Sequence, residues 1–233
     1  MNRKKALIRN LALTAGCTLL IYTVSGFFFV PESAFRVSER SSHYGPSEIV
    51  CVGDAGSAQY FFGSFENYIS LTEIKRYYLP VLWTIGNQYL GHRRDLSQAL
   101  DPQYSSHVLS DGLSSAGAGR RVIVYGYVND PSVTLLELNY GDGHVLRLDL
   151  PDPDGGSSAQ SLQRRVLLPG DAAAAAALPS DNGVFFLFCF IQPPDSSAVM
   201  YYRWLRGLSS DQTLLYEYSP QTGVTIPPPD SSS

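Results

Sequence analysis

The chain has 233 residues, of which 44% are hydrophobic and 16% charged, with 17 basic against 21 acidic side chains. Globular proteins carry about 25% charged residues, so this chain is poor in charge but apolar enough to build a core. The composition therefore excludes wholesale disorder, and the lack of a glycine period or a heptad repeat excludes collagen-like and coiled-coil chains. A net charge of −4 argues against nucleic acid as the main partner.

The N-terminal segment predicts attachment to a membrane. The run from Leu11 to Val30 has 20 residues without a charge, and as a helix it would span about 30 Å, the thickness of the hydrocarbon core. Four basic residues and no acidic one precede it: Arg3, Lys4, Lys5 and Arg9. The positive-inside rule then predicts a cytoplasmic basic tail at 1–10, a single-pass transmembrane helix at 11–30 in the cell membrane, and an extracytoplasmic location for residues 31–233.

Two alternatives share this N-terminal pattern. Residues 24–26 could serve as a cleavage site, so that the chain is secreted after signal-peptide cleavage near Gly26. The apolar side chains at 27–30 extend the run past that point and favour an uncleaved anchor. Residues 13–17 end in a cysteine, like a lipobox, but the apolar run continues directly after Cys17 and favours an ordinary membrane-facing residue.

The outer part divides by composition. Residues 31–46 are polar, end in Gly-Pro and predict a stalk, and 47–219 predict an extracytoplasmic domain. The polar stretch 91–119 predicts a long loop, which makes a seam between two potential subdomains, 47–90 and 120–218. Residues 220–233 predict a disordered tail rich in proline and serine. Without the four basic residues of the N-terminal tail, 13 basic and 21 acidic side chains remain, a net charge of −8.

Strand signals dominate the domain. Short β-branched or alternating runs lie at 48–52, 59–62, 65–69, 121–128, 133–140, 145–150, 183–191, 200–205 and 213–218. Gly63-Ser64 predicts a hairpin turn, and 133–140 is expected beside 121–128. Residues 71–85 also fit a helical stripe, but Pro80 favours two short strands. A second long loop is predicted at 151–182, where the six alanines 172–177 are too few to hold a helix alone.

These signals predict an all-β or β-rich fold, an antiparallel sandwich or barrel-like extracytoplasmic domain behind one N-terminal transmembrane helix. The run 183–191 is continuously apolar and predicts a strand covered on both faces. Residues 125–138, followed by Gly-Asp-Gly at 141–143, form a strand-turn-strand unit. This unit, around residues 121–145, resembles one in uncharacterised single-pass envelope proteins of Gram-positive bacteria, and the resemblance implies a location and a fold but no site residue.

Few residues suggest chemistry. Cys51 and Cys189 form an even pair outside the membrane and are the candidates for a disulfide, although two buried thiols are the favoured interpretation. His92, Asp95 and His107 share the predicted loop 91–119 and could meet a loop serine in a hydrolase site, although a Gly-x-Ser-x-Gly motif is absent.

Metal sites are not supported by the spacing of the ligand residues. His43, His92, His107 and His144 do not stand at zinc-ligand spacing. Asp149, Asp152 and Asp154 precede Gly155 without the full calcium-loop pattern, so a turn is the simpler interpretation.

The sequence therefore predicts a non-catalytic, membrane-anchored protein with a binding or structural role at the bacterial cell envelope. Its expected partners are the membrane and an envelope protein or cell-wall component, with no catalytic residue, cofactor or metal. The alternative is a secreted or anchored hydrolase with a site built from the loop 91–119.

Overall fold

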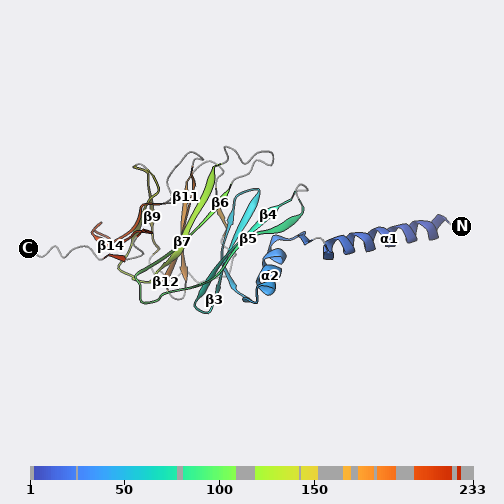
Figure 1. The fold of residues 1–233 in the computed structure, drawn as a ribbon, viewed down its shortest axis with the longest axis horizontal. Coiled ribbons are helices and arrows are strands. Elements are labelled where there is room, and N and C mark those ends of the chain that lie inside the picture. The colour runs from blue at the N-terminus through green and yellow to red at the C-terminus, as the bar shows by residue number, and fades with distance from the viewer. Residues whose placement is uncertain are drawn as a thin grey trace, which may run out of the picture.

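The computed structural model describes residues 3–24, 26–77, 81–108, 119–141, 143–151, 165–168, 173–180, 183–192, 202–221 and 225–226. These residues contain two helices and fifteen strands. The helices are α1 (Arg3–Val24) and α2 (Pro31–Ser41). Figure 1 shows α1 projecting from one end of the body and β14 at the other. The β-rich prediction is confirmed.

The strands form three sheets that are antiparallel except for one pair, β2 with β10. Sheet A has the order β1-β5-β4-β3-β2-β10, with β1 (Phe27–Phe28), β2 (Glu48–Asp54), β3 (Ala58–Phe65), β4 (Tyr68–Arg76), β5 (Trp83–Arg93) and β10 (Arg165–Leu167). Sheet B has the order β11-β12-β7-β6, with β6 (Leu100–Val108), β7 (Arg120–Val128), β11 (Ala174–Ser180) and β12 (Gly183–Gln192). Sheet C has the order β15-β14-β13-β8-β9, with β8 (Leu135–Asn139), β9 (Val145–Asp149), β13 (Trp204–Leu208), β14 (Leu214–Tyr218) and β15 (Thr225–Ile226).

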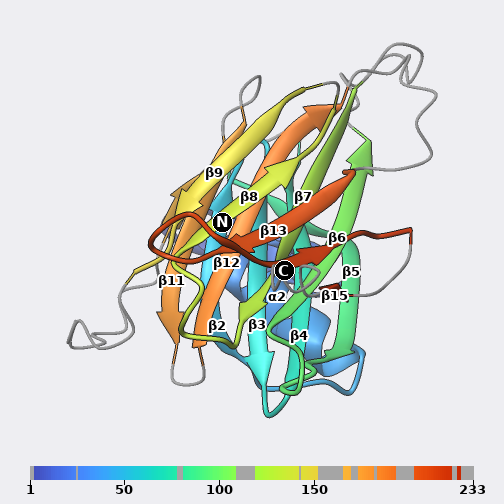
Figure 2. The same cartoon turned by 90° about the vertical axis from the view of Figure 1, so that its left-hand side faces the viewer.

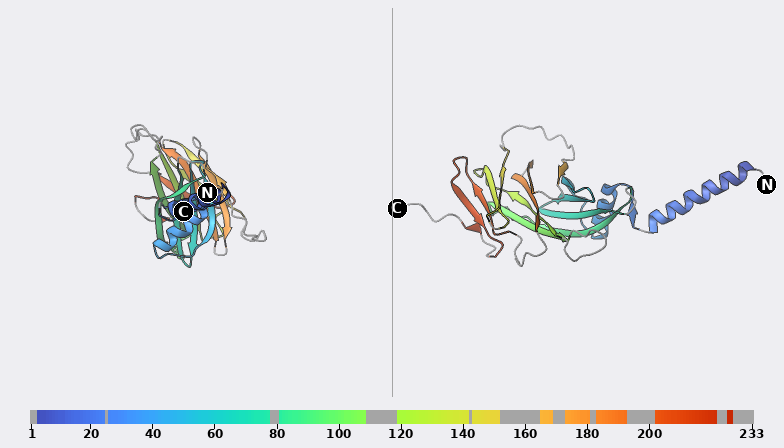
Figure 3. Two further views of the ribbon diagram at one scale, coloured as in Figure 1. Left: turned by 90° about the vertical axis from the view of Figure 1, so that its right-hand side faces the viewer. Right: turned by 90° about the horizontal axis from the view of Figure 1, so that it is seen from above.

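The sheets stack as layers along the long axis of the molecule. From the N-terminal end the order is α2, sheet A, sheet B and sheet C (Figure 1), and the view from above in Figure 3 shows the same sequence of layers. Seen from the C-terminal end, sheet C lies across the front of the strands of sheet B (Figure 2). Sheet B is therefore the central layer.

Alternation along β12 explains how sheet B can be central. Phe185, Leu187 and Cys189 pack in the cluster shared with sheet A, whereas Phe186 and Phe188 pack in the cluster shared with sheet C. Side chains of a strand alternate between faces, so a strand buried on both faces must be apolar throughout. The prediction that 183–191 is covered on both sides is confirmed.

Helix α2 closes the outer face of sheet A. Ala34 and Phe35 are fully buried, and the Phe35 ring stacks on that of Phe61 at 5.1 Å. Trp83 and Ile74 complete this cluster. The predicted stalk at 31–46 is therefore wrong for its larger part, because one face of this segment is apolar enough to pack as a helix.

The N-terminal helix has different bounds from the predicted span 11–30. It begins at Arg3 and ends at Val24, because Gly26 takes a positive φ of 67° and Phe27–Phe28 pairs with β5. The part of the predicted span that lies within the helix, 11–24, has 14 residues and a length of about 21 Å. None of the helices among the described residues is long and apolar enough to cross a membrane.

The first hairpin turn also lies elsewhere than predicted. Strand β3 runs through Gly63 and Ser64, and the chain turns at Glu66 and Asn67, where Glu66 has a φ of 53°. A Cβ atom on Gly63 would lie 2.7 Å from the hydroxyl of Ser70. This glycine therefore permits close packing inside the sheet and does not form a turn.

Both predicted long loops contain strands. Strand β6 lies within 91–119, and β10 and β11 lie within 151–182. The alanine run forms β11 because it pairs along β12, from Ala174 opposite Cys189 onward. The predicted C-terminal tail contains β15, which pairs with β14. Residues 71–85 do form two strands, β4 and β5, on either side of the turn.

The predicted strands 121–128 and 133–140 are not neighbours. Strand β7 lies between β6 and β12 in sheet B, whereas β8 lies between β13 and β9 in sheet C. Both edges of β7 are occupied, so the turn after it carries the chain across to the next layer. The following hairpin, β8 with β9, forms as predicted.

The two buried cysteines are thiols in the structure, without the candidate disulfide between them. Cys51 on β2 and Cys189 on β12 belong to the same core cluster between sheets A and B. Burial raises the pKa of the Cys189 thiol to about 11, against a smaller lowering effect of the Arg121 charge. Cys17 is exposed on α1.

Candidate functional site

Polar side chains line one face of β6, the edge strand of sheet B. Asp101, Gln103, Ser105 and His107 occupy alternate positions, so all four point toward sheet A. We call them the β6 polar row. Ser105 and His107 are each 2% exposed and Asp101 is 5% exposed, while Gln103 is half-buried. The row is therefore partly open to solvent at Gln103, on the side of Asp101, and closed at Ser105 and His107. We call these its partly open end and its sealed end.

At the sealed end, a serine, a histidine and a glutamate lie in sequence. The Ser105 hydroxyl is 2.7 Å from His107 Nε2, and His107 Nδ1 is 3.4 Å from Glu73 Oε2. Glu73 comes from β4 of sheet A, so the contact joins the two sheets. The Tyr60 hydroxyl donates to Glu73 Oε1 at 3.2 Å, and the rings of Tyr60 and His107 meet edge to face at 4.9 Å.

Glu73 is held as a carboxylate despite its burial. Burial raises its pKa, but the hydrogen bond and charge of His107, the Lys75 charge and the Asn87 backbone outweigh this effect and hold the pKa at about 2. The Asn87 backbone N–H and side-chain amide lie 3.3 and 3.1 Å from Glu73 Oε2, and Lys75 Nζ lies 3.3 Å from it. A buried carboxylate with this many donors is electrostatically satisfied.

The order serine, histidine, carboxylate is the one that serine hydrolases use to activate a nucleophile. A working nucleophile must also reach its substrate, and Ser105 is almost fully covered. Neither of the two surface pockets described below is lined by Ser105, His107 or Glu73. As it stands, the arrangement is a closed polar network between two sheets.

The partly open end of the row contains the other predicted residues. His92 Nε2 lies 3.3 Å from Asp101 Oδ1 and 2.7 Å from the Gln103 amide nitrogen. The Asp95 backbone N–H donates to Asp101 Oδ2 at 3.0 Å. Asp101 thus links His92 with Asp95, whereas His107 belongs to the separate sealed end. The residues of the hydrolase alternative do not converge in one pocket among the described residues.

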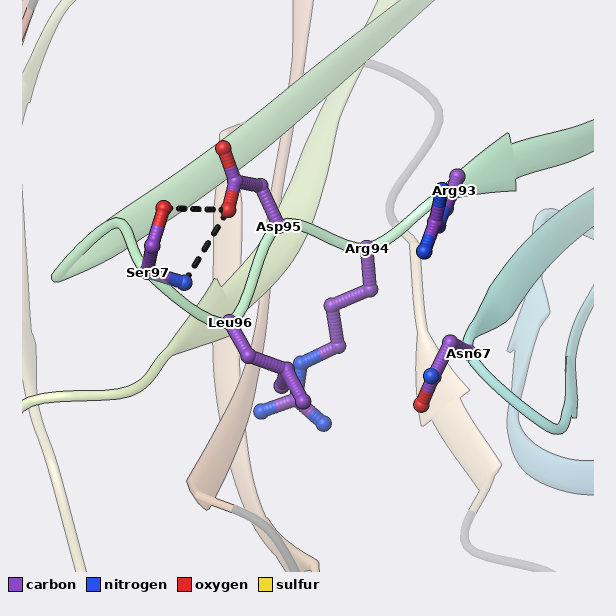
Figure 4. Close-up of a pocket in the computed structure, with 6 residues that line it drawn as sticks. All are labelled: Asn67, Arg93, Arg94, Asp95, Leu96 and Ser97. Carbon is purple, nitrogen blue, oxygen red and sulfur yellow. Dashed lines mark hydrogen bonds between the residues drawn. The ribbon is translucent and has the colours of Figure 1, made fainter.

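A surface pocket of about 540 Å³ lies where β5 ends. Asn67, Arg93, Arg94, Asp95, Leu96 and Ser97 line it (Figure 4). The Arg94 guanidinium lies 3.8 Å from the centre of the Tyr127 ring and donates to the Asn129 side chain, and burial lowers its pKa. The Asp95 carboxylate accepts from the Ser97 hydroxyl at 2.6 Å and the Ser97 backbone N–H at 3.0 Å, and these hydrogen bonds lower its pKa. The lining is thus organised by contacts within the loop and by contacts of Arg94 with Tyr127 and Asn129.

A second pocket of about 600 Å³ lies at the C-terminal end of α2 and includes Arg36, Arg40 and His43. His43 has a φ of 55° and is exposed there, and His144 is exposed beside the Tyr140 ring. No group of three metal-ligating side chains occurs among the residues with assigned positions. Asp149 lies on β9, while Asp152, Asp154 and Gly155 lie outside the described residues.

Glu73, Ser105, Asp101 and Tyr60 are the site residues that the sequence analysis missed. The available signal was the alternation of polar residues from 101 to 107, which has the period of a strand with one polar face. The chain matches no protein-family model, no curated protein and no solved structure.

Proposed function

We propose that this chain is an exported protein, attached to the membrane by its N-terminal segment, with a non-catalytic binding role at the bacterial cell envelope. The observation that carries the proposal is the layered body, which has α1 at one end and sheet C at the other (Figure 1). A net charge of −8 outside the basic N-terminus is consistent with a protein partner more than with an anionic polymer.

The properties of α1 support attachment. The side chains of Leu7, Ile8, Leu11, Leu13 and Leu20 are 64–73% exposed, so the helix presents its apolar surface to its surroundings. The part of α1 within the predicted span, 11–24, has 14 residues, fewer than the roughly 20 that span a bilayer. This length also suits the apolar region of a signal peptide. Mass spectrometry of the N-terminus of the mature protein distinguishes retention from cleavage near Gly26.

The outer face of sheet C carries a row of alternating charges. Arg147 is opposite Glu137, Glu137 is opposite Arg206, and Arg206 is opposite Glu217, on four adjacent strands. Arg147 Nε lies 2.8 Å from Glu137 Oε1, and Arg206 Nε lies 2.6 Å from Glu217 Oε2. The Arg206 guanidinium also lies 4.0 Å from the centre of the Trp204 ring. We call these four charged residues the charge row.

These pairs hold long side chains in one arrangement before any partner arrives. Less side-chain entropy is then lost on binding, which favours recognition by a pre-organised surface. Arginine and tryptophan are also the residues most enriched at the energetic centres of protein interfaces. The charge row and Trp204 therefore favour a protein partner on the outer face of sheet C.

Photo-crosslinking in the native cells tests this function. A crosslinking amino acid at Val145, which is 41% exposed on the strand β9 of sheet C, should capture one protein reproducibly. The control position is Leu167 on β10 of sheet A, which is 78% exposed. Arg206→Glu should abolish capture from Val145, and the reciprocal pair Arg206→Glu with Glu217→Arg should restore part of it. Equal capture from both positions, or none from Val145, would reject the proposed binding face.

A hydrolase is the second candidate function, and the distances from Ser105 to His107 and from His107 to Glu73 favour it. Burial of Ser105 opposes it. Incubation of the intact chain with a fluorophosphonate probe decides between the two. Labelling that disappears in Ser105→Ala would establish the hydrolase, whereas an unlabelled Ser105 supports the non-catalytic role.

A further inference from the structure

Exposed apolar side chains gather where the chain leaves α1 and enters the body. Phe29 is 52% and Val30 53% exposed in the connector between β1 and α2. Tyr77 and Val81, beside the turn from β4 to β5, are 42% and 58% exposed. We call these four residues the connector patch. Side chains of this size exposed together on a soluble surface indicate an interaction site.

The two segments of the connector patch adjoin although they are about 50 residues apart in the chain. Phe27 pairs with Thr84 and Phe28 with Trp83, so the connector continues alongside the beginning of β5. The rings of Phe27 and Tyr77 are in contact, with centroids 4.4 Å apart. The connector and the end of β4 at Tyr77 therefore adjoin one another.

Basic residues lie on β4 and α2, the elements that adjoin this surface. Arg76 is exposed at the end of β4, with its guanidinium 4.8 Å from the centre of the Trp83 ring, and the Lys75 side chain is 47% exposed. On α2, Arg40 is exposed and the Arg36 side chain is 32% exposed.

Three acidic residues pair with two of these basic ones: Glu32 and Glu39 lie 3.9 and 3.0 Å from Arg36, and Glu73 lies 3.3 Å from Lys75. The four basic and three acidic side chains together carry a formal charge of +1, on a body whose net charge is −8. The exposed Arg40 and Arg76 therefore supply the positive charge of this region.

We propose that the connector patch rests in the interfacial layer of an anionic phospholipid bilayer, which holds sheet A and α2 against the membrane surface. This inference rests on the proposed membrane attachment through α1. Aromatic side chains favour the headgroup layer, and arginines can extend from it to phosphates. Basic residues near an anionic surface strengthen attachment to it. The short uncharged part of α1 makes the contribution of Phe29, Val30 and Val81 to membrane attachment larger.

Spin-label depth measurements on the full-length chain test the proposal. Cys17→Ser removes the exposed thiol, and Cys51 and Cys189 are fully buried, so a new surface cysteine is labelled selectively. One nitroxide at Val81→Cys reports on the connector patch, and a matched control at Val145→Cys reports on sheet C. A third label at Leu13→Cys reports independently on α1. The chain is reconstituted in vesicles of phosphatidylcholine with phosphatidylglycerol, and each label is exposed to oxygen and to a water-soluble nickel chelate.

Residue 81 is expected to collide with the nickel chelate at least about threefold less often than residue 145, because interfacial side chains lie several ångströms below the water boundary. Vesicles of phosphatidylcholine alone should weaken this protection, and equal protection in both kinds of vesicle would overturn the role of the anionic lipid. A shielded residue 13 with a water-accessible residue 81 would overturn the connector patch and leave the attachment by α1 intact. Accessibility at both positions would overturn the membrane attachment as well. Protection at residue 81 alone would support the connector patch and reject α1 as the attachment.

Discussion

Replacing Glu73 by glutamine removes one negative charge from the sealed end of the β6 polar row and keeps the side-chain shape. The carboxylate has contacts with His107, Lys75, Asn87 and Tyr60 in the wild-type chain. An amide can keep some of these hydrogen bonds but not the ionic ones. We therefore expect a loss of stability that depends on pH.

The magnitude follows from the pKa of Glu73, which is about 2 in the folded protein against an ordinary value of 4.5. A carboxyl group with a lowered pKa stabilises the fold fully above its unfolded pKa, and this contribution is lost as the pH falls through the folded pKa. The difference corresponds to about 3 kcal/mol of unfolding free energy. Glu73→Gln should therefore be about 3 kcal/mol less stable than the wild type at pH 6, and the gap should close between pH 4.5 and pH 2.

Urea unfolding of the full-length chain at a series of pH values, followed by circular dichroism, measures this gap. Glu48→Gln is the matched control, because Glu48 is exposed at the start of β2 and its substitution should leave the free energy of unfolding nearly unchanged. A difference between the wild type and Glu73→Gln that stays constant from pH 6 to pH 2 would refute the assignment of a charged, buried Glu73. Equal stability of the two proteins at pH 6 would refute it equally.

Gly126→Ala should lower the unfolding free energy by about 3 kcal/mol or more, because its Cβ atom would lie 2.1 Å from a β6 carbonyl oxygen. Gly141→Ala, with no atom closer than 3.7 Å, should differ little in thermal unfolding, and equal melting temperatures for the two variants would contradict the packing. Phe35→Ala should lower the free energy of unfolding in urea by about 3–5 kcal/mol, because it leaves a cavity between α2 and sheet A. A change below about 1 kcal/mol would show that α2 is not packed as described. In the folded chain without lipid, a maleimide should modify Cys17 quickly and leave Cys189, which is fully buried with a pKa raised to about 11, unmodified until urea unfolds the protein. Rapid modification of Cys189 without urea would mean that the interface of sheets A and B is open.

The strands that could be predicted are those with a local signal. Strands β7 and β12 are nearly continuous apolar runs, and β9 alternates strictly, with Leu146 and Leu148 against the core and Arg147 outside. These patterns follow from burial on two faces or on one. Neither pattern contains information on which strands pair. The assignment of β7 and β8 to different sheets therefore depends on contacts distant in sequence.

The elements that were missed are those where tertiary contacts override local preference. The alanines of β11 favour a helix in isolation, but they extend because β12 offers an unpaired edge. Strand β6 has a polar face, so its sequence predicts a loop, and the partners of that face, Glu73 and His92, come from sheet A. For the same reason His107 could be identified as a candidate from the sequence while its partners could not.

The central position of sheet B also has a consequence for the order in which the chain can fold as it is made. Strands β2 to β5 form a meander of consecutive strands, so sheet A can pair early, with short loops. Its inner face nevertheless stays uncovered until β7 and β12 are present, and β12 covers sheet C as well. Because contacts distant in sequence form slowly, a nascent chain that ends before residue 183 would expose two apolar sheet faces at once. Translocation in an unfolded state would delay all three layers until the whole chain has crossed the membrane, and it would avoid this aggregation-prone intermediate.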